Sequence, residues 1–444
     1  MVKRLGERDV NMRKATKQIT IVAIAALLLG GIASTAAAQG LVGQCADCHT
    51  MHNSEQGKPV ALQGSSTTAS ATPNPNLLKM DCIACHASGG GEMVRVLDGG
   101  SRIPQVLHTA ATDLAAGNFR HITTGGDRKG HNVIDVVSAD STFTRPPGYK
   151  DHDPLGFTFD VSKLTCAGNM GCHGIRGQQL DPGDPFLGTD PTYRTGLAAL
   201  SGNDGPTATS TTYFSGAHHS NYDGLKSDGA HPEFYENPLA HSYRFIRGLK
   251  GYGNMTDRWQ NIDSASHNEY SGGYVSDTIK NTDFGTTTTC NRCHLGNQST
   301  TARLYVPNSS VTGFCITCHG SFHSSGATNG SSGAFLRHPS DYVIPNDGEY
   351  ANYTAFDVTA PVARPAAGFV TGFTPSADVN AGTDMVMCLS CHVPHASPYD
   401  GMLRFDYDSL TSKMRAGSFA SIEAAQAEGG CFACHTTKGV TKGL

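Results

Sequence analysis

Apolar and polar positions along this chain follow neither a sustained helical period nor a sustained strand period. The clearest helical stretch is Ser418–Glu428, which contains Ile422, Ala424 and Ala425. Elsewhere Gly, Pro, Asn, Asp and Ser interrupt the pattern every few residues, as they do in turns and loops. The pattern therefore predicts mostly coil with short α-helices and very little β structure.

The N-terminus has a different character. A Lys/Arg-rich stretch over residues 3–17 is followed by an apolar run from Ile19 to about Ile32 and by small residues ending at Ala38. This order predicts a signal peptide over residues 1–38. The alternative is a single-pass anchor, but the run is shorter than the roughly 20 residues that a span needs. No later stretch is apolar enough to cross a membrane, so we expect an exported protein, in the periplasm or extracellular at the cell surface.

Charge and composition narrow the choice further. The whole chain carries −5, and residues 1–38 hold six Lys/Arg and two Asp/Glu, so the mature chain carries −9. No basic stripe remains, which argues against a nucleic-acid partner. Apolar residues make up only 38%, with one tryptophan and 52 glycines, so ordinary core material is scarce. Such a chain is either disordered or built around embedded cofactors.

The cysteines favour cofactors. Each of the 14 belongs to a pair whose second member is followed directly by His. Six pairs are C-x-x-C-H: Cys45 and Cys48 with His49, Cys82 and Cys85 with His86, Cys290 and Cys293 with His294, Cys315 and Cys318 with His319, Cys388 and Cys391 with His392, and Cys431 and Cys434 with His435. On a helical turn, positions i and i+3 share one face with i+4 beside them. Two thiols can thus reach two vinyl groups of a porphyrin while the His binds its iron. Disulfides and zinc are weaker alternatives, because neither needs a His after every pair.

The seventh pair, Cys166 and Cys172 followed by His173, has five residues between its thiols. Gly168, Asn169 and Gly171 allow the extra residues to bulge outward. We expect a seventh haem c here, with a local Cys166–Cys172 disulfide as the alternative.

Thirteen of the 20 His remain once each iron has one proximal ligand, so bis-His ligation is possible throughout. His52, His323 and His395 each follow a proximal His by three or four residues. That length spans at most roughly 10–14 Å, hardly enough to pass around a porphyrin to the opposite face of the same iron. Each is therefore predicted to ligate a neighbouring haem, with a surface His as the alternative. Met ligands are possible but less favoured.

The motifs divide the mature chain into a two-haem segment (39–150), a segment with the irregular pair and a His-bearing insert (151–285), and a four-haem segment (286–444). We expect a multihaem cytochrome c fold in which coil and short helices wrap around a chain of haems.

The chain resembles the exported multihaem c-type cytochromes of metal-reducing bacteria. The marks of the resemblance are Cys45-Ala-Asp-Cys-His-Thr-Met-His52, Gly125–Val133, Cys166–Gly174, Ser242–Gly251, His267–Tyr270, Arg337-His338-Pro339 and Cys388-Leu-Ser-Cys-His-Val-Pro-His395. The resemblance implies electron transfer through the periplasm or across the outer surface. It also implies further distal iron ligands at His131, His267, His338 and one of His218 and His219.

Three functions remain open at this point. The first is an electron carrier without catalytic residues, whose partners are other redox proteins or an extracellular electron acceptor. The second is a multihaem reductase with one open haem, for which no motif gives a sign. The third is a self-assembling subunit of a haem-lined filament. The anionic mature chain favours basic patches on partners and salt-sensitive association.

Overall fold

The computed structural model describes residues 44–74, 77–97, 102–147, 160–167, 171–173, 246, 249–250, 259–272, 311–319, 338, 340, 342–365 and 375–441. The chain divides into two units, Met1–Gln39 and Gly40–Leu444, and the described residues all belong to the second. The predicted signal peptide lies outside the described residues. The three-segment division of the mature chain stays a prediction.

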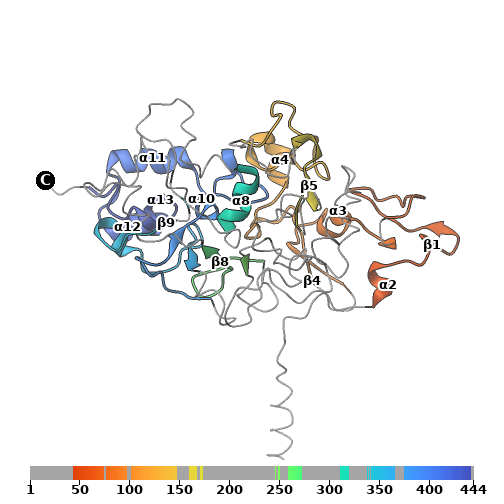
Figure 1. Ribbon diagram of the computed structural model, residues 1–444, viewed down its shortest axis with the longest axis horizontal. Coiled ribbons are helices and arrows are strands. Elements are labelled where there is room, and N and C mark those ends of the chain that lie inside the picture. The colour runs from red at the N-terminus through yellow and green to blue at the C-terminus, as the bar shows by residue number, and fades with distance from the viewer. Residues whose placement is uncertain are drawn as a thin grey trace, which may run out of the picture. The chain divides into compact units, whose positions relative to one another are not determined.

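The helices are short (Figure 1). The α-helices of the described residues are α2 Cys45–Cys48, α3 Cys82–His86, α4 Arg120–Gly125, α8 Val311–His319, α10 Cys388–Cys391, α11 Tyr407–Ala416, α12 Ile422–Glu428 and α13 Cys431–Cys434. Single 3₁₀ turns are η2 Asp127–Lys129, η3 Val161–Lys163, η8 Gly348–Asn352 and η9 Asp400–Met402. The predicted fold class, mostly coil with short helices, is confirmed for these residues.

Side-chain caps decide where several helices begin. The Asp81 carboxylate accepts the Ala84 amide at 2.8 Å and starts α3 at the first Cys of its motif. Ser421 accepts the Ala424 amide in the same way, so α12 starts at Ile422 and not at the predicted position 418. The pattern missed α11, although Asp406 caps its start and Gly417, in the left-handed region at φ 62°, ends it.

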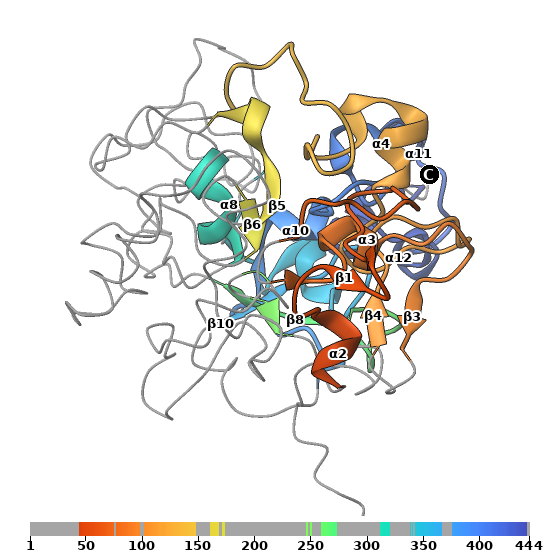
Figure 2. The same cartoon turned by 90° about the vertical axis from the view of Figure 1, so that its right-hand side faces the viewer.

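The strands are two to four residues long: β1 Ser54–Glu55, β2 Lys58–Pro59, β3 Val94–Val96, β4 Arg102–Pro104, β5 Thr165–Ala167, β6 Gly171–His173, β7 Leu249–Lys250, β8 Glu269–Gly272, β9 Tyr342–Val343, β10 Ala363–Pro365 and β11 Met385–Val386. Five of them form one sheet in the order β7-β8-β10-β11-β9, in which only the β8–β10 pair is parallel. Figure 2 shows β8 beside β10. No local alternation predicted this sheet, because its strands come from distant parts of the chain.

The apolar cores are small and separate. One gathers Tyr270, Val311 and Met385 on the five-stranded sheet, and the Cys172 and Cys315 side chains pack against it. Others surround Tyr353 and Phe432, with the Cys434 and Cys431 side chains at their edges. Motif thiols therefore stand at the borders of the apolar clusters. No described helix has the length and apolar content needed to cross a membrane.

Candidate haem sites

The described C-x-x-C-H motifs all form a helical turn. The turns are α2, α3, α10 and α13, together with the last part of α8, and each places its two thiols on one face with the His directly after the second. Helices α8 and α10 pack together (Figure 1). The Thr312 hydroxyl lies 3.4 Å from the Cys388 amide.

Two of these turns show how the His is placed. In the first motif, α2 ends at Cys48, and the amide of His49 donates to the Cys45 carbonyl at 2.8 Å, so the imidazole leaves the chain one turn after the first thiol. In α8, Cys315, Cys318 and His319 all lie within the helix, and both thiols are half-buried.

One predicted motif cannot be placed in this way. Cys290, Cys293 and His294 lie outside the described residues, so their role as a haem attachment site stays a prediction from the sequence.

The irregular pair has a different local structure. Cys166 lies in β5 and Cys172 in β6, and the two strands run parallel with Ala167 opposite His173. A side chain at Gly171 would collide with the backbone of Ala167, so glycine permits this close return of the chain. The two sulfur atoms are not joined, so the predicted alternative of a Cys166–Cys172 disulfide is not formed.

Burial favours the neutral form of the thiols of Cys85, Cys391 and Cys434. It raises the pKa of Cys85 to about 11 and that of Cys391 to about 12. The pKa of Cys434 is also raised by burial. A redox-active Cys pair has the opposite property, a lowered pKa at an exposed and electropositive position. These thiols are therefore built for a permanent covalent role and not for thiol–disulfide exchange.

Thiols of different motifs lie close together. The Cys82 and Cys166 side chains are in hydrogen-bonding contact, which raises the pKa of Cys166. Cys431 is close enough to Cys391 for the two thiols to influence each other electrostatically, so the last two motifs are also neighbours. Groups attached at Cys82 and Cys166, or at Cys391 and Cys431, would be adjacent.

Four of the described proximal imidazoles are oriented through their Nδ1 atoms. Each N–H donates to an acceptor at the distance given: His86 to the Pro104 carbonyl (2.8 Å), His319 to the Pro147 carbonyl (2.6 Å), His392 to the Gly401 carbonyl (2.7 Å) and His435 to the Glu349 carboxylate (3.2 Å). A carbonyl or carboxylate oxygen can only accept, so the proton resides on Nδ1 and the Nε2 lone pair is left for a metal ion. Metal-ligating His residues in general have this outer hydrogen bond.

Three pairs of imidazoles lie at a common spacing. The ring centres are 6.1 Å apart for His131 and His319, 6.2 Å for His173 and His395, and 6.2 Å for His338 and His435. A metal–imidazole nitrogen bond is about 2 Å long, so two imidazoles on opposite sides of one metal ion have ring centres about 6 Å apart. In each pair one member follows a Cys pair and the other is a predicted distal ligand.

One loop positions two of these distal residues. The chain after His392 threads between two other segments: the His395 amide donates to the Ala116 carbonyl at 2.8 Å, and the His131 amide donates to the His395 carbonyl at 3.0 Å. The His131 Nδ1 lies 2.7 Å from the Pro394 carbonyl. Gly117, at φ 85°, allows the chain around Ala396 to approach it closely, because a side chain at position 117 would overlap the Ala396 carbonyl.

Both distal imidazoles are neutral at neutral pH. Burial, together with the neighbouring imidazoles, lowers the pKa of His131 to about 4 and that of His395 to about 3. Phe119 stacks on the His395 ring at 4.7 Å. A neutral imidazole has the free lone pair that iron requires.

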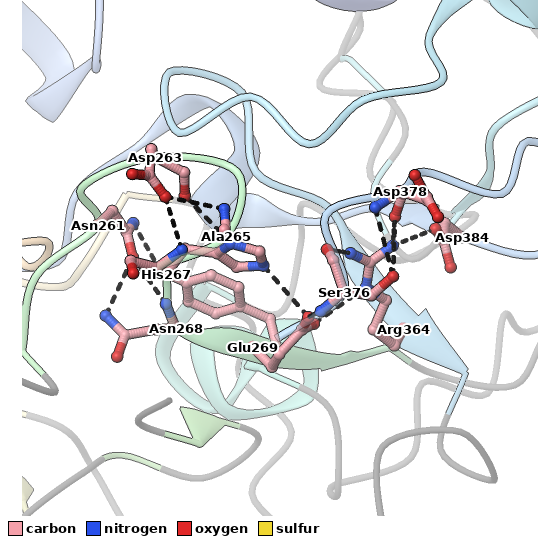
Figure 3. A network of polar contacts seen from close by, with 12 residues as sticks. Asn261, Asp263, Ala265, His267, Asn268, Glu269, Arg364, Ser376, Asp378 and Asp384 are labelled. Atoms are coloured by element: carbon pink, nitrogen blue, oxygen red, sulfur yellow. Dashed lines mark hydrogen bonds and ion pairs between the residues drawn. The ribbon is translucent and has the colours of Figure 1, made fainter. Parts of the chain in front are cut away.

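His267 lies in a different environment from the one predicted for an iron ligand. Its Nδ1 is 3.3 Å from the Asp263 carbonyl, its Nε2 is 3.2 Å from the Glu269 carboxylate, and its ring stacks on Phe356 (Figure 3). Glu269 in turn bonds Arg364. Since both ring nitrogens face acceptors inside the protein, these contacts give no support to His267 as a ligand.

The carboxylates of this network differ in their protonation. Burial raises the pKa of Asp384 above its ordinary value, even though Arg364 lowers it. Burial would also raise the pKa of Glu269, but hydrogen bonds from His267 and Arg364 bring it below its ordinary value. The network joins β8 to β10 and holds buried charge without a Cys pair.

The remaining predicted distal ligands divide into two groups. His52 is described and exposed, directly after Met51, whose side chain is 88% exposed. His218, His219 and His323 lie outside the described residues. Sequence reasoning missed Glu349, since a lone carboxylate 86 positions before its imidazole partner carries no local signal.

These observations fit haem c. The helical turns place paired thiols beside an imidazole, the Nδ1 contacts aim Nε2 outward, and the imidazole pairs have the spacing of axial ligands. The residues present are those that would hold the group covalently and through its iron.

Comparison with known proteins agrees with this chemistry. No family model matches the chain. C-type cytochrome OmcS of Geobacter sulfurreducens is 27% identical over 433 residues, which cover 89% of this chain and 86% of that protein. The chain is therefore similar to a multihaem c-type cytochrome over most of its length. The described motif turns fit haem c, and electron transfer is the function that such a group supports.

Two solved structures are also similar to this chain. The outer membrane cytochrome S filament from Geobacter sulfurreducens matches at 20% identity with a TM-score of 0.38, and the OmcS nanowires from the same organism match at 19% with a TM-score of 0.40. Each match covers 83% of this chain and 85% of the other.

Proposed function

We propose that the cytochrome carries electrons along seven covalently bound haems whose irons are mostly held by two His residues each. The observation that carries the proposal is the spacing of three imidazole pairs, whose ring centres are 6.1–6.2 Å apart. Haem iron, when bound, alternates between the ferric and ferrous states and so takes up and releases one electron at a time. Two axial imidazoles leave no open position for a substrate, so we propose an electron carrier and not an enzyme.

The axial assignments follow from the same pairs. His319 and His131 would share one iron, His435 and His338 another, and His173 and His395 a third. The third assignment supports a haem at the irregular pair of Cys166 and Cys172, because His395 would have no iron to bind there without it. It also agrees with the expectation that a His shortly after one motif ligates the haem of another.

The contacts between thiols support a continuous electron path. The second motif touches the irregular pair through Cys82 and Cys166, and the last two motifs are close through Cys391 and Cys431. The His395 loop joins the motif of His392 to the irregular pair. The chain's role is to hold neighbouring groups rigidly at these junctions, so that electrons pass between them without diffusion of a carrier.

Intact mass of the mature holoprotein tests the count. Seven haem increments and no disulfide are expected, whereas six increments with two hydrogens lost would remove the haem from Cys166 and Cys172. The mass of the peptide that contains Cys290, Cys293 and His294 tests the motif that the structure does not describe, and this peptide should carry one haem.

Electron paramagnetic resonance tests the axial ligation. The oxidised protein should be low-spin, and a strong high-spin ferric signal that shifts with nitrite would favour a reductase instead.

A pair of variants tests the assignment of His395. His395→Met should replace one axial imidazole by a thioether. The low-spin signal of one haem should then change, while all haems are retained. His121→Met is the matched control, because His121 Nε2 is bonded to Asp113 at 2.6 Å and belongs to no imidazole pair described above. Identical spectra for the two variants would refute the assignment.

A second candidate function is that of a filament subunit. The similarity to OmcS favours it, since that protein has been solved as a filament, and so does exposed Met51 beside exposed His52 at the first motif. In such an assembly a terminal haem would take its distal His from the next subunit. Light scattering and electron microscopy of the secreted protein test this, and monomers with complete axial ligation would refute it.

Other redox proteins or an extracellular electron acceptor are the proposed partners. The mature chain is anionic, so basic patches on a partner would attract it. Faster association at low ionic strength is the expected sign of this attraction.

A further inference from the structure

We propose that Glu349 is a positioning residue that makes the haem attached at Cys431 and Cys434 more strongly reducing than those whose proximal His donates to a backbone carbonyl. The inference rests on the proposed function. Its observation is a difference among the described Nδ1 contacts: the acceptor is neutral for His86, His319 and His392 but is a carboxylate for His435.

The Glu349 carboxylate is held in place from both sides. Its Oε1 lies 3.2 Å from the His435 Nδ1, and its Oε2 accepts the Thr437 hydroxyl at 3.1 Å. The side chain is only 13% exposed. Its backbone carbonyl accepts the Thr436 hydroxyl, which ties η8 to the residues directly after α13. The carboxylate therefore cannot turn away from the imidazole without breaking several contacts.

A negative acceptor changes the imidazole more than a neutral one does. A carboxylate draws the Nδ1 proton toward itself and raises the basicity of Nε2. A more basic axial ligand stabilises ferric iron relative to ferrous iron, which lowers the reduction potential. Lys438 lies 3.8 Å from the same carboxylate, but its side chain is 54% exposed and solvent screens its charge.

The surroundings of His435 support a fixed geometry. Tyr350 meets the ring edge-on at 5.4 Å, and the Asn352 amide donates to the Thr436 hydroxyl at 3.0 Å. Both residues come from η8, the element that carries Glu349. The 3₁₀ turn thus presents a carboxylate and an aromatic ring to the proximal ligand of the last motif.

The test is an optical redox titration of the holoprotein with Glu349→Gln. This variant keeps the size and an acceptor oxygen but removes the charge. One haem's share of the absorbance change should move to a more positive potential, with the remaining titration unchanged. Glu428→Gln is the matched control, since Glu428 pairs with Lys413 at the surface, and its titration should superimpose on that of the wild type.

Thr437→Val provides a result of opposite sign. It removes the hydroxyl that shares the carboxylate charge, so the same haem should become more reducing. A purely structural role for Glu349 would move both variants in one direction. A Glu349→Gln titration identical to that of the wild type, or equal shifts in both variants, would overturn the proposal. Absence of haem from the peptide containing Cys431 and Cys434, measured by mass, would instead contradict the proposed function.

Discussion

Replacing Arg364 by methionine is expected to destabilise the cytochrome by about 3–5 kcal/mol, because two buried carboxylates lose their cation. The side chains of Arg364, Glu269 and Asp384 are 8%, 6% and 2% exposed. The guanidinium Nε lies 2.9 Å from Glu269, and Nη1 bonds Asp384 directly (Figure 3). Methionine keeps a flexible apolar stem near Phe356 but carries no charge and no donor.

Two further contacts place the expected loss toward the upper end of that range. The guanidinium donates to the carbonyls of Ser376 and Asp378, each at 2.8 Å, and a bond from a charged donor contributes about 1.5–3 kcal/mol. The rest of the lost stability arises because the buried carboxylates of Glu269 and Asp384 no longer have a cation beside them. Adding Asp384→Asn to Arg364→Met should therefore restore part of the lost stability, although Asp384→Asn alone removes a native contact.

Urea unfolding of the purified holoprotein, followed by far-ultraviolet circular dichroism, measures the change through the shift in midpoint. Arg128→Met is the matched control. Its partner Asp400 lies 3.4 Å away, but the two side chains are 79% and 55% exposed, so the loss should stay below about 1 kcal/mol. Equal midpoints for the two Arg variants would refute the reasoning, as would no recovery in the double variant.

Three further outcomes are expected. Phe432→Ala should lower the free energy of unfolding by about 3–5 kcal/mol in a thermal or urea experiment, because the fully buried ring packs against Leu410 and its removal leaves a cavity. A loss under about 1 kcal/mol would contradict this packing. Gly117→Ala should displace the loop at Ala396 and alter the low-spin resonance of one haem, since φ is 85° and the new side chain has no room; an unchanged spectrum would argue against the loop's role. Asn53→Ala should lower the free energy of unfolding by about 1–3 kcal/mol, because it leaves buried backbone groups such as the Ala61 amide without their partner. Amide hydrogen exchange near residue 61 should become faster.

The sequence alone determined the chemistry. A C-x-x-C-H turn brings its thiols and imidazole together within five residues, so the attachment sites need no distant contact to be recognised. The frequent Gly, Pro, Asn, Asp and Ser residues likewise predicted short helices, and the scarcity of apolar residues predicted embedded cofactors. The start of α12 was misplaced by four residues because the Ser421 cap, and not the apolar spacing, decides where the helix begins.

Only the tertiary structure decided which imidazoles meet. The partners His131 and His319, like His173 and His395, are far apart in the sequence, and their pairing depends on the loop after His392 passing between two other segments. A second ligand needs only a lone pair at the right distance, which leaves no local pattern. For the same reason His267 matched a ligand-bearing segment by sequence yet lies in an ion network, since the acceptors that occupy its nitrogens are brought there by folding.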